Sequence, residues 1–222
     1  MKIAIVNAGN IGRTLAKPWY EEGHELLVAK QGSQEKLDRF MEEIRDATRG
    51  TIQQAADFGE VVLFSVYWLK LDEVLAEVGE LEDKIVIDTM NPLKVNEQYE
   101  HTHDLEFMQS SSTSEELQKR LPKARIVKAF STFPAPVLDA SQWSNNPVKP
   151  AVLVASDDSA AKEVVFQLVH DAGFQPLNVG SLANGRSIEQ LGVLLHHVGE
   201  NHFDGDYQRL APTFLQAVSS AN

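Results

Sequence analysis

A chain of 222 residues can bury one substantial core, as a single large domain or as a domain with a small lobe. It carries 20 Lys and Arg residues against 32 Asp and Glu residues, a formal net charge of −12, with no long basic run. This charge argues against nucleic acid and anionic membranes as partners. The absence of cysteine excludes disulfides and cysteine nucleophiles, and no apolar run is long enough to span a membrane, so we expect a cytoplasmic protein.

The first predicted element is a buried strand over residues 2–6, which leads through a glycine turn into a helix over residues 11–22. The turn, NAGNIG at residues 7–12, is an imperfect G-x-G-x-x-G pattern with Asn7 in place of the first glycine. Asn adopts left-handed backbone angles more readily than other non-glycine residues, so the pattern tolerates this change. We predict a pyrophosphate site at Gly9, Asn10, Ile11 and Gly12, although such a turn also occurs without a nucleotide.

The second predicted strand, residues 25–29, ends without the acidic residue that sites for NAD place near this point to hold the ribose 2′-hydroxyl. Lys30, Ser33 and Lys36 follow it instead. These side chains can hold a 2′-phosphate by charge-assisted hydrogen bonds, which favours NADP(H) over NAD(H). The alternative is that both lysines are solvated and that Ser33 only caps the next helix.

The chain continues as an alternation of helices and strands, several of them continuous apolar runs that are typical of strands buried on both faces. This alternation predicts an α/β fold, a doubly wound parallel sheet of the Rossmann type. In chain order we expect a helix at 33–48, strand 50–52, helix 53–58, strand 60–66, helix 69–78, strand 84–88, helix 115–121, strands 124–129 and 150–155, helix 158–172 capped by Asp157, and strand 175–179.

Ligands of such sheets bind beyond the carboxyl ends of the strands. The fourth strand ends at Val66 and leads into Tyr67 and Trp68, whose two rings can form the wall of a flat ligand site or pack under a loop. Asn91 and Pro92 follow the fifth strand. The side-chain amide of Asn91 can contact ribose or nicotinamide; alternatively, the two residues only form a turn. Ser131, Thr132, Phe133 and Pro134 follow the sixth, and we expect Trp68, Phe130, Phe133 and Pro134 to cluster around a second ring.

The remaining clusters of similar residues are interpreted without assigning them a ligand. No metal site is predicted from the histidines at 101, 103, 196, 197 and 202, because no acidic or cysteine partner has a convincing spacing. The serine-rich segment 110–114 is interpreted as a loop that caps a helix. The apolar helix over residues 188–198 has apolar residues on more than one face, so it is either core or a dimer interface.

Taken together, these motifs resemble the NADPH-dependent F420 reductases, also called coenzyme-F420-dependent NADP oxidoreductases. The reductase domain of the six-transmembrane metalloreductases is a more distant resemblance. The resemblance covers nearly the whole chain and is carried by NAGNIG at 7–12, DTMNPL at 88–93, RLPKARIVKAFSTFPA at 120–135 and GSLANGR at 180–186.

The resemblance implies a dinucleotide-binding domain over residues 1–130 and a small C-terminal α/β lobe over 131–222 that packs on it and closes the cleft. It also implies a homodimer and hydride transfer between NADPH and the deazaflavin F420. Lys30, Ser33 and Lys36 match the 2′-phosphate site, residues 131–134 line the nicotinamide and deazaflavin, and residues 182–184 close the pocket. Tyr67 and Ser131 depart from the family, which usually has proline at the first position and often His or Asn at the second.

Hydride transfer between two rings needs placement more than acid–base groups, so the lack of a catalytic triad does not oppose this interpretation. We expect Ser131 and Thr132 to orient the acceptor by hydrogen bonds. The residues leave the acceptor open between F420, FMN, FAD and a chelated ferric ion. A basic patch of Lys119, Arg120, Lys123, Arg125 and Lys128 would suit the acidic tail of F420. The alternative function is a sensor that binds NADP(H) without turnover.

Overall fold

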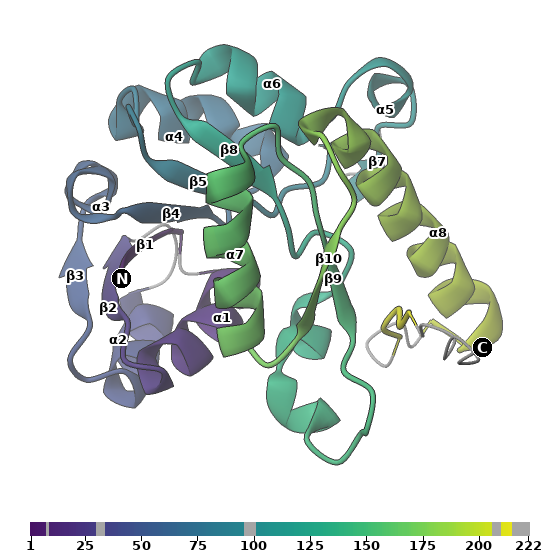
Figure 1. The fold of residues 1–222 in the computed structure, drawn as a ribbon, viewed down its shortest axis with the longest axis horizontal. Helices are drawn as coiled ribbons and strands as arrows, with labels where there is room; N and C mark the ends of the chain where they lie inside the picture. Colours follow the sequence, from purple (N-terminus) through teal and green to yellow (C-terminus); the bar gives the residue numbers. More distant parts are fainter. Residues whose placement is uncertain (8, 30–33, 96–100, 206–209, 215–222) are drawn as a thin grey trace, which may run out of the picture.

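A six-stranded parallel sheet forms the centre of the computed structural model (Figure 1), which describes residues 1–7, 9–29, 34–95, 101–205 and 210–214. The strand order is β3-β2-β1-β4-β5-β8, so it reverses between β1 and β4. This order confirms the predicted doubly wound Rossmann-type α/β fold. The strands are β1 (Lys2–Val6), β2 (Glu25–Ala29), β3 (Thr48–Gly50), β4 (Val61–Phe64), β5 (Ile85–Asp88) and β8 (Arg125–Lys128).

Helices cover both faces of this sheet, and each face has its own apolar core. Successive side chains of a strand point to opposite faces, so Ile3 and Ile5 of β1 belong to one core cluster while Ala4 and Val6 belong to the other. The first cluster is covered by α1 (Asn10–Glu21), α2 (Gln34–Glu43) and α7 (Ser159–Asp171). The second is covered by α3 (Ile52–Phe58), α4 (Leu71–Val78) and α6 (Thr113–Arg120).

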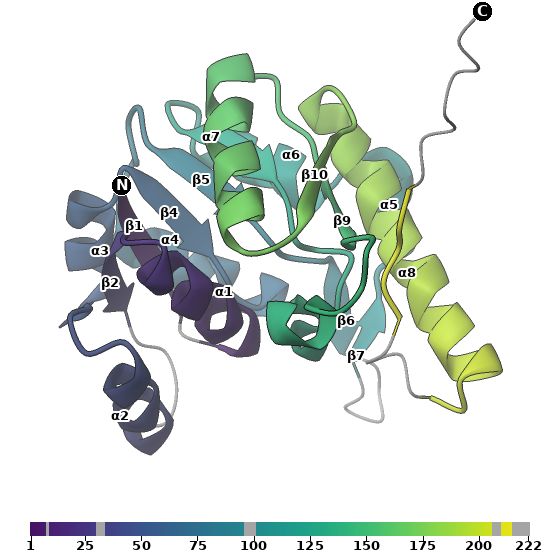
Figure 2. The same ribbon diagram turned by 60° about the horizontal axis from the view of Figure 1, so that its bottom comes forward.

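The later part of the chain adds smaller elements around the carboxyl ends of β5 and β8. A parallel pair, β9 (Ala151–Val154) and β10 (Gln175–Asn178), is attached to β8 by an antiparallel bridge between Lys128 and Ala155. An antiparallel pair, β6 (Leu93–Val95) and β7 (His101–His103), lies beside the long helix α8 (Gly185–His202) in both views (Figures 1 and 2). The remaining elements are α5 (Phe107–Ser110) and the 3₁₀ turns η1 (Trp68–Lys70), η2 (Ala135–Leu138), η3 (Ala140–Trp143) and η4 (Leu182–Asn184).

The central sheet uses residues up to Lys128, whereas β9, β10, α7 and α8 follow it in sequence. We therefore retain the division into residues 1–130 and 131–222 as a proposal. The two parts are closely packed, since α7 covers the first face of the sheet and the Trp19 indole N–H of α1 donates to the Leu168 carbonyl at 2.8 Å. No helix in the described part of the chain has the length and apolarity needed to cross a membrane.

Several helix boundaries differ from those predicted, and at α3 and α7 capping side chains decide where the helix begins. The Thr51 hydroxyl accepts from the Gln54 N–H, and the Thr51 N–H donates to Gln54 Oε1. As a result α3 begins one residue after Thr51 and one residue earlier than predicted, and β3 lies two residues earlier than predicted. The cap of α7 is Asp158, whose carboxylate accepts from the Ala161 N–H at 2.8 Å. Asp157, the predicted cap, instead accepts from the N–H of Leu182.

Candidate cofactor and acceptor sites

The turn after β1 has the backbone geometry that its sequence predicts. Asn7 adopts a left-handed conformation with φ of 70°, in the position where related patterns have glycine. The Gly9 N–H donates to the Asn7 carbonyl at 2.8 Å, which closes the turn. The Asn7 side-chain amide donates to the carbonyl of Ser65, just after β4, at 2.9 Å. Asn7 therefore ties the turn to the neighbouring strand at the switch point, which a glycine could not do.

The two glycines of the turn serve different purposes. A Cβ at Gly12 would lie 2.9 Å from both the Asn7 carbonyl oxygen and an Ile5 methyl carbon, so close packing of α1 on β1 requires glycine there. The Gly12 N–H also donates to the Ser65 hydroxyl at 3.0 Å. A Cβ at Gly9 would meet no heavy atom closer than 3.6 Å. A Cβ at Gly9 would therefore make only ordinary contacts with the protein, so packing does not require this glycine, whereas the close approach of a pyrophosphate would.

The N-terminus of α1 is suited to an anion. Gly9 occupies the N-cap position and contributes no side-chain hydrogen bond, and the first turn contains no acidic residue. The first N–H groups of a helix lack partners within the helix and carry a partial positive charge, so Asn10 and Ile11 offer backbone donors at this end. The structure thus brings Gly9, Asn10, Ile11 and Gly12 together as predicted, and their contact with a pyrophosphate stays a prediction.

The predicted 2′-phosphate residues fall largely outside the described structure. Lys30 and Ser33 lie outside the described residues. Lys36 lies in α2, but its side chain is also outside what the structure describes. The preference for NADP(H) at this point therefore rests on the sequence.

The aromatic residues after β4 and β8 do not form the predicted cluster. Trp68 packs against Phe107 with a centroid distance of 5.3 Å, next to the core on the α4 face. Phe130 lies in the core of the opposite face, with its ring edge-on to Trp19 at 6.2 Å. The expected grouping of Trp68 with Phe130 and Phe133 is therefore wrong, because Trp68 packs against the core of one face of the sheet and both phenylalanines belong to the core of the other. Val66 is buried in the same core as Trp68, and the exposed fraction of Tyr67 is 62%.

A small pocket does form where the chain leaves β5 and β8, and we call it the Asn91 pocket. Its volume is about 160 Å³, below the range typical of whole-ligand sites, so it can take one edge of a ring. The predicted residues Asn91, Ser131, Thr132, Phe133 and Pro134 all line it. Pro92 is buried next to Asn91, and its carbonyl accepts from the Asp104 N–H at 2.8 Å. The other lining residues are His103, Gly192, Leu195, His196 and Leu210, which the sequence analysis did not assign to a pocket.

Residues 182–184, which the family resemblance places at the pocket, do not line it. Leu182 is buried in the core beside α6, and Asn184 donates to the Val179 carbonyl at the start of α8. The wall comes instead from the middle of α8, where residues 195 and 196 follow residue 192 by three and four positions. This helical spacing is the sequence signal that would have indicated them.

Three polar atoms in the Asn91 pocket are buried without a hydrogen-bond partner in the described part of the chain: Asn91 Oδ1, Ser131 Oγ and His103 Nδ1. The Asn91 amide nitrogen is already used, since it donates to the Ser131 carbonyl at 2.9 Å. Unpaired buried polar atoms are unfavourable and uncommon in native proteins. Their grouping in one pocket indicates a site that a polar ligand edge completes.

A buried ionic cluster, Asp88, Thr113, Ser114, Lys128 and Glu189, lies beneath this pocket. All five residues are fully buried. The Lys128 ammonium donates to Glu189 and Thr113 at 2.7 Å and to Asp88 at 3.2 Å, and Ser114 donates to Asp88 at 2.5 Å. Burial alone would lower the pKa of Lys128, but the two carboxylates raise it above its ordinary value. Burial raises the pKa of Glu189, and Lys128 opposes this shift.

The ionic cluster connects both sides of the Asn91 pocket. Lys128 also donates to the Met90 carbonyl, one residue before Asn91, at 2.5 Å. Glu189 belongs to α8 and lies one turn before Gly192. The interpretation of residues 110–114 as a loop with a cap is only partly right. Ser112 does accept from the Glu115 N–H. Thr113 and Ser114, however, are buried and donate hydroxyl hydrogen bonds to the Asp88 carboxylate.

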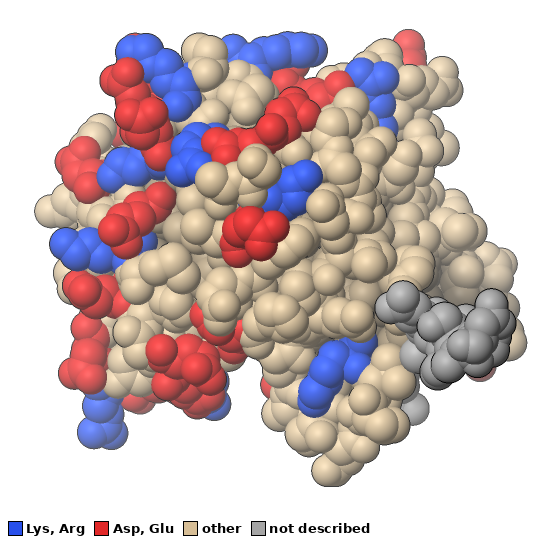
Figure 3. Space-filling model, in the orientation of Figure 1, with Lys and Arg blue, Asp and Glu red and all other residues tan. Residues whose placement is uncertain are grey.

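The predicted basic patch does not exist as a free positive surface. Lys128 is buried in the cluster, Arg125 pairs with Asp158, and Lys123 pairs with Glu80. The other two members are paired as well, Lys119 with Glu116 and Arg120 with Asp72. On the face in Figure 3, charges of both signs mix over the central sheet and its helices, whereas the side over α8 is mostly uncharged.

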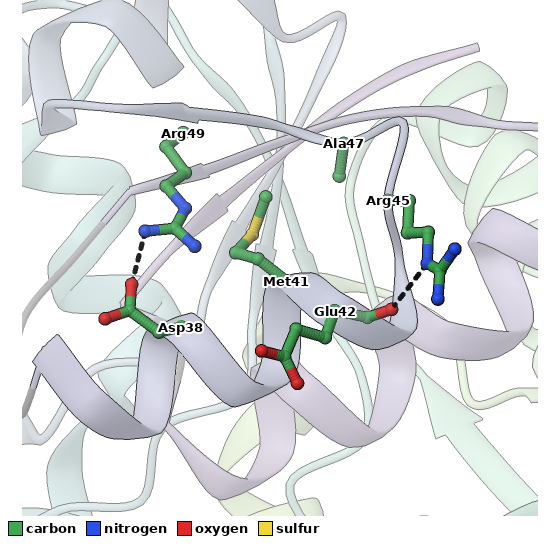
Figure 4. A pocket seen from close by; sticks show the side chains of 6 residues that line it. All are labelled: Asp38, Met41, Glu42, Arg45, Ala47 and Arg49. Carbon is green, nitrogen blue, oxygen red and sulfur yellow. Dashed lines mark hydrogen bonds and ion pairs between the residues drawn. The ribbon is translucent and has the colours of Figure 1, made fainter.

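A larger, shallow pocket of about 580 Å³ lies between α2 and β3 (Figure 4). Its charged side chains bind one another or the backbone: Arg49 forms an ion pair with Asp38, and Arg45 donates to the Glu42 carbonyl at 3.4 Å. We assign no ligand to it, since both arginines already have partners. The described residues contain no group of three or more His, Cys, Asp or Glu side chains arranged to hold a metal ion.

The sheet order and the glycine turn at its switch point define a Rossmann-type dinucleotide-binding protein. Residues 2–92 match the model of the family described as NADP oxidoreductase, coenzyme F420-dependent, which confirms the resemblance predicted from the sequence. This segment, which is less than half of the chain, is therefore similar to a class of NADP-dependent oxidoreductases.

Individual relatives agree with this class. The chain is 27% identical over 195 residues to the metalloreductase STEAP3 of Rattus norvegicus, a match that covers 87% of this chain and 37% of that protein. It thus spans little more than a third of the metalloreductase. A crystal structure from Arthrobacter sp. FB24, provisionally described as an F420-dependent NADP reductase, superposes with a TM-score of 0.80 at 23% identity and covers 90% of this chain and 94% of that one.

A reductive aminase from Aspergillus terreus, in complex with NADPH and ethyl levulinate, is similar at a TM-score of 0.63 and 17% identity. That match covers 92% of this chain and 62% of the aminase. At these identities, the two structural matches support the fold and no finer statement.

Proposed function

We propose that the protein is an NADP(H)-dependent oxidoreductase that transfers hydride between NADPH and the ring of a deazaflavin such as F420, or of FMN or FAD. The observation that carries this proposal is the pairing of two features at the carboxyl ends of the strands. One is the uncapped glycine turn between β1 and α1, and the other is the Asn91 pocket, where three polar atoms have no hydrogen-bond partner among the described residues. The description of the family that residues 2–92 match supports the same choice.

The residues present fit NADP(H). The absence of a Cβ at Gly9 leaves the backbone approachable, and the uncapped N-terminus of α1 offers N–H donors for the pyrophosphate. Lys30, Ser33 and Lys36 remain our proposed residues for the 2′-phosphate. The bound dihydronicotinamide supplies the hydride, so the protein needs to hold two rings in contact and exclude water.

Ser131 and Thr132 are our proposed residues for orienting the acceptor. Both are buried, both line the Asn91 pocket, and the Ser131 hydroxyl has no partner in the described part of the chain. Asn91 Oδ1 can only accept a hydrogen bond, so the ligand edge that completes the pocket carries an N–H or O–H group. We propose only this edge as the contact, because of the small volume of the pocket.

The test is NADPH oxidation by the purified protein with F420, FMN, FAD and a ferric chelate as separate acceptors, beside a measurement of NADPH affinity. Turnover with F420 or a flavin supports the proposal and identifies the acceptor. Turnover with the ferric chelate alone would overturn the proposal that the acceptor is a ring, and it would match the activity named for the metalloreductase relative. Tight NADPH binding without turnover on any acceptor would favour a sensor of NADP(H).

We also propose that the protein forms a homodimer and that it is cytoplasmic, as predicted from the sequence. On α8, the exposed fraction of Leu194 is 57%, so this helix presents apolar surface outside the core. Light scattering on the purified chain measures its mass directly, and a monomer at micromolar concentration would contradict the dimer.

A further inference from the structure

His103 is a titratable residue in the Asn91 pocket that the proposed hydride transfer does not yet use. It is the last residue of β7 and is half-buried. Its Nδ1 atom has no hydrogen-bond partner in the described part of the chain. Two other unpartnered polar atoms, on Asn91 and Ser131, line the same pocket. The imidazole is thus placed among the groups that would meet the acceptor edge.

The surroundings of His103 come from two packed elements. From α8, the His196 ring meets it edge-on with a centroid distance of 5.7 Å, and His196 Nε2 lies 3.0 Å from Glu200. His197, also on α8, lies 3.4 Å from the same glutamate. From β6, Lys94 pairs with Asp104, the residue after His103. Burial first, and then the charges of His196 and His197, lower the pKa of His103 from its ordinary 6.5.

We propose that His103 exchanges the proton that accompanies hydride transfer to a ring acceptor in this pocket. The inference rests on the proposed function and adds a catalytic group to it. Hydride carries two electrons and one hydrogen to the acceptor ring, which then needs one proton to become neutral. Protonated His103 gives up its Nδ1 proton as an N–H or O–H bond forms on the ring, and the neutral imidazole regains a proton from water.

This step balances: NADPH, the oxidised acceptor and one proton yield NADP⁺ and the reduced acceptor. No other titratable side chain of the pocket is as well placed. His196 lines the pocket too, but its ring already contacts His103 on one side and Glu200 on the other. His196 lies edge-on beside His103 and 3.0 Å from the exposed Glu200, and the imidazole regains its proton from water.

The proposal fixes the direction of the pH dependence. Reduction of the acceptor needs protonated His103, so its rate falls as the pH rises through the lowered pKa of this residue. The reverse reaction, from reduced acceptor to NADP⁺, needs the neutral imidazole, so its rate rises through the same pKa. Removal of the imidazole removes both inflections and slows each direction by about 100-fold, within the usual range for general acid–base catalysis.

The experiment compares wild type with His103→Gln and His103→Asn, using whichever ring acceptor the wild type reduces. His202→Gln, at the exposed end of α8 and away from the pocket lining, is the matched control. Pre-steady-state rates in both directions are measured across pH, with NADPH affinity and melting temperature for every variant. We expect flat pH profiles only in the two His103 variants, with NADPH affinity unchanged.

A second readout does not depend on turnover. NMR titration of the His103 imidazole, with and without oxidised acceptor and NADP⁺ bound, should show a changed pKa on binding if the Nδ1 atom meets the acceptor. A wild-type pH profile in both variants, or an unchanged imidazole titration, would overturn the role of His103. If the wild type reduces none of the ring acceptors, the proposed function itself fails. This outcome can be told apart from a failure of the role of His103 alone, in which the wild type still reduces a ring acceptor.

Discussion

Lys128 and Glu189 are 61 residues apart in the sequence, yet the ammonium nitrogen of one lies 2.7 Å from a carboxylate oxygen of the other, and both side chains are fully buried. Lys128 comes from the last strand of the central sheet and Glu189 from α8. Their contact fixes α8 over the carboxyl ends of β5 and β8. The two walls of the Asn91 pocket therefore depend on one ion pair that does not itself line the pocket.

Loss of Lys128 should be strongly destabilising. Lys128→Met leaves Asp88 and Glu189 buried without their cation, and breaking a buried pair in this way costs about 3–5 kcal/mol. Urea unfolding of the wild type and the variant measures the difference. Lys123→Met is the matched control, because Lys123 pairs with Glu80 at the surface and its loss should change stability little. A Lys128→Met protein as stable as wild type would show that the pair is not needed.

A double-mutant cycle separates the Lys128–Glu189 contact from general burial. The paired change Lys128→Met with Glu189→Gln should lose less stability than the sum of the two single changes, because the second change removes a charge that the first leaves unpaired. Strict additivity of the two losses would contradict a direct coupling between these side chains.

Substitutions at Gly9 and Gly12 should have different effects, since the first should weaken only cofactor binding and the second both stability and binding. Gly9→Ala fits the protein alone, so we expect an unchanged melting temperature but at least about tenfold weaker NADPH binding, as the added methyl group blocks the pyrophosphate. Gly12→Val crowds Asn7 and Ile5, so both stability and binding of either dinucleotide should fall. Calorimetry and NADPH titration measure these effects. Undiminished NADPH affinity in Gly9→Ala would place the pyrophosphate elsewhere.

Lys30→Ala should weaken NADPH binding while leaving NADH binding nearly unchanged. The reason is the absence of an acidic residue after β2, with Lys30 in the place where a 2′-phosphate would be held. The measurement is the ratio of the two dissociation constants in wild type and variant, at fixed ionic strength. Lys17→Ala, on α1, controls for a general loss of positive charge. Equal weakening of both dinucleotides by Lys30→Ala would refute a 2′-phosphate contact.

Asp158 should stabilise the protein in a pH-dependent way. The Arg125 guanidinium, and then the Ala161 N–H at the start of α7, lower the pKa of Asp158 from 3.8 to about 2. A lowered carboxyl pKa gives stability that is present above the unfolded value and lost as the pH falls through the folded one. Asp158→Ala should therefore cost about 1 kcal/mol at neutral pH through loss of the cap, and the difference should shrink between pH 4 and 2.

Thermal unfolding across pH checks this prediction, with Glu163→Ala on the exposed side of α7 as the control. A difference between wild type and Asp158→Ala that stayed constant down to pH 2 would show that the ionised carboxylate is not what stabilises α7.

Local signals in the sequence were sufficient for much of the fold. The apolar runs of β1, β2 and β4 and the glycine turn at Asn7 follow from nearest neighbours and backbone preference, and the structure confirms them. The approximate positions of α7 and α8 follow from helical periodicity in the same way. Helix ends were less predictable, since adjacent Asp157 and Asp158 are equivalent by sequence and only tertiary contact assigns the cap.

The site was predictable only where its residues directly follow strands. Asn91 and Ser131 were found this way, because parallel strands end at the same edge of the sheet. His103 and His196 meet through the packing of β7 on α8, and no spacing in the sequence indicates that contact. Lys128 was misjudged as a surface residue for the same reason, since its two carboxylate partners lie 40 and 61 residues away.

Gly192 lines the Asn91 pocket, so a larger residue there would reduce the space for a ligand. A methyl group there would lie 3.7 Å from the Ser131 carbonyl oxygen and 3.8 Å from Asn91 Oδ1, which is ordinary contact rather than a clash. A substitution would therefore shrink the pocket without straining the helix. Residue 189, which forms the buried ion pair, and residue 192, which lines the pocket, are one turn of α8 apart. An altered acceptor range could thus be engineered at this position without redesigning the fold or the phosphate loop.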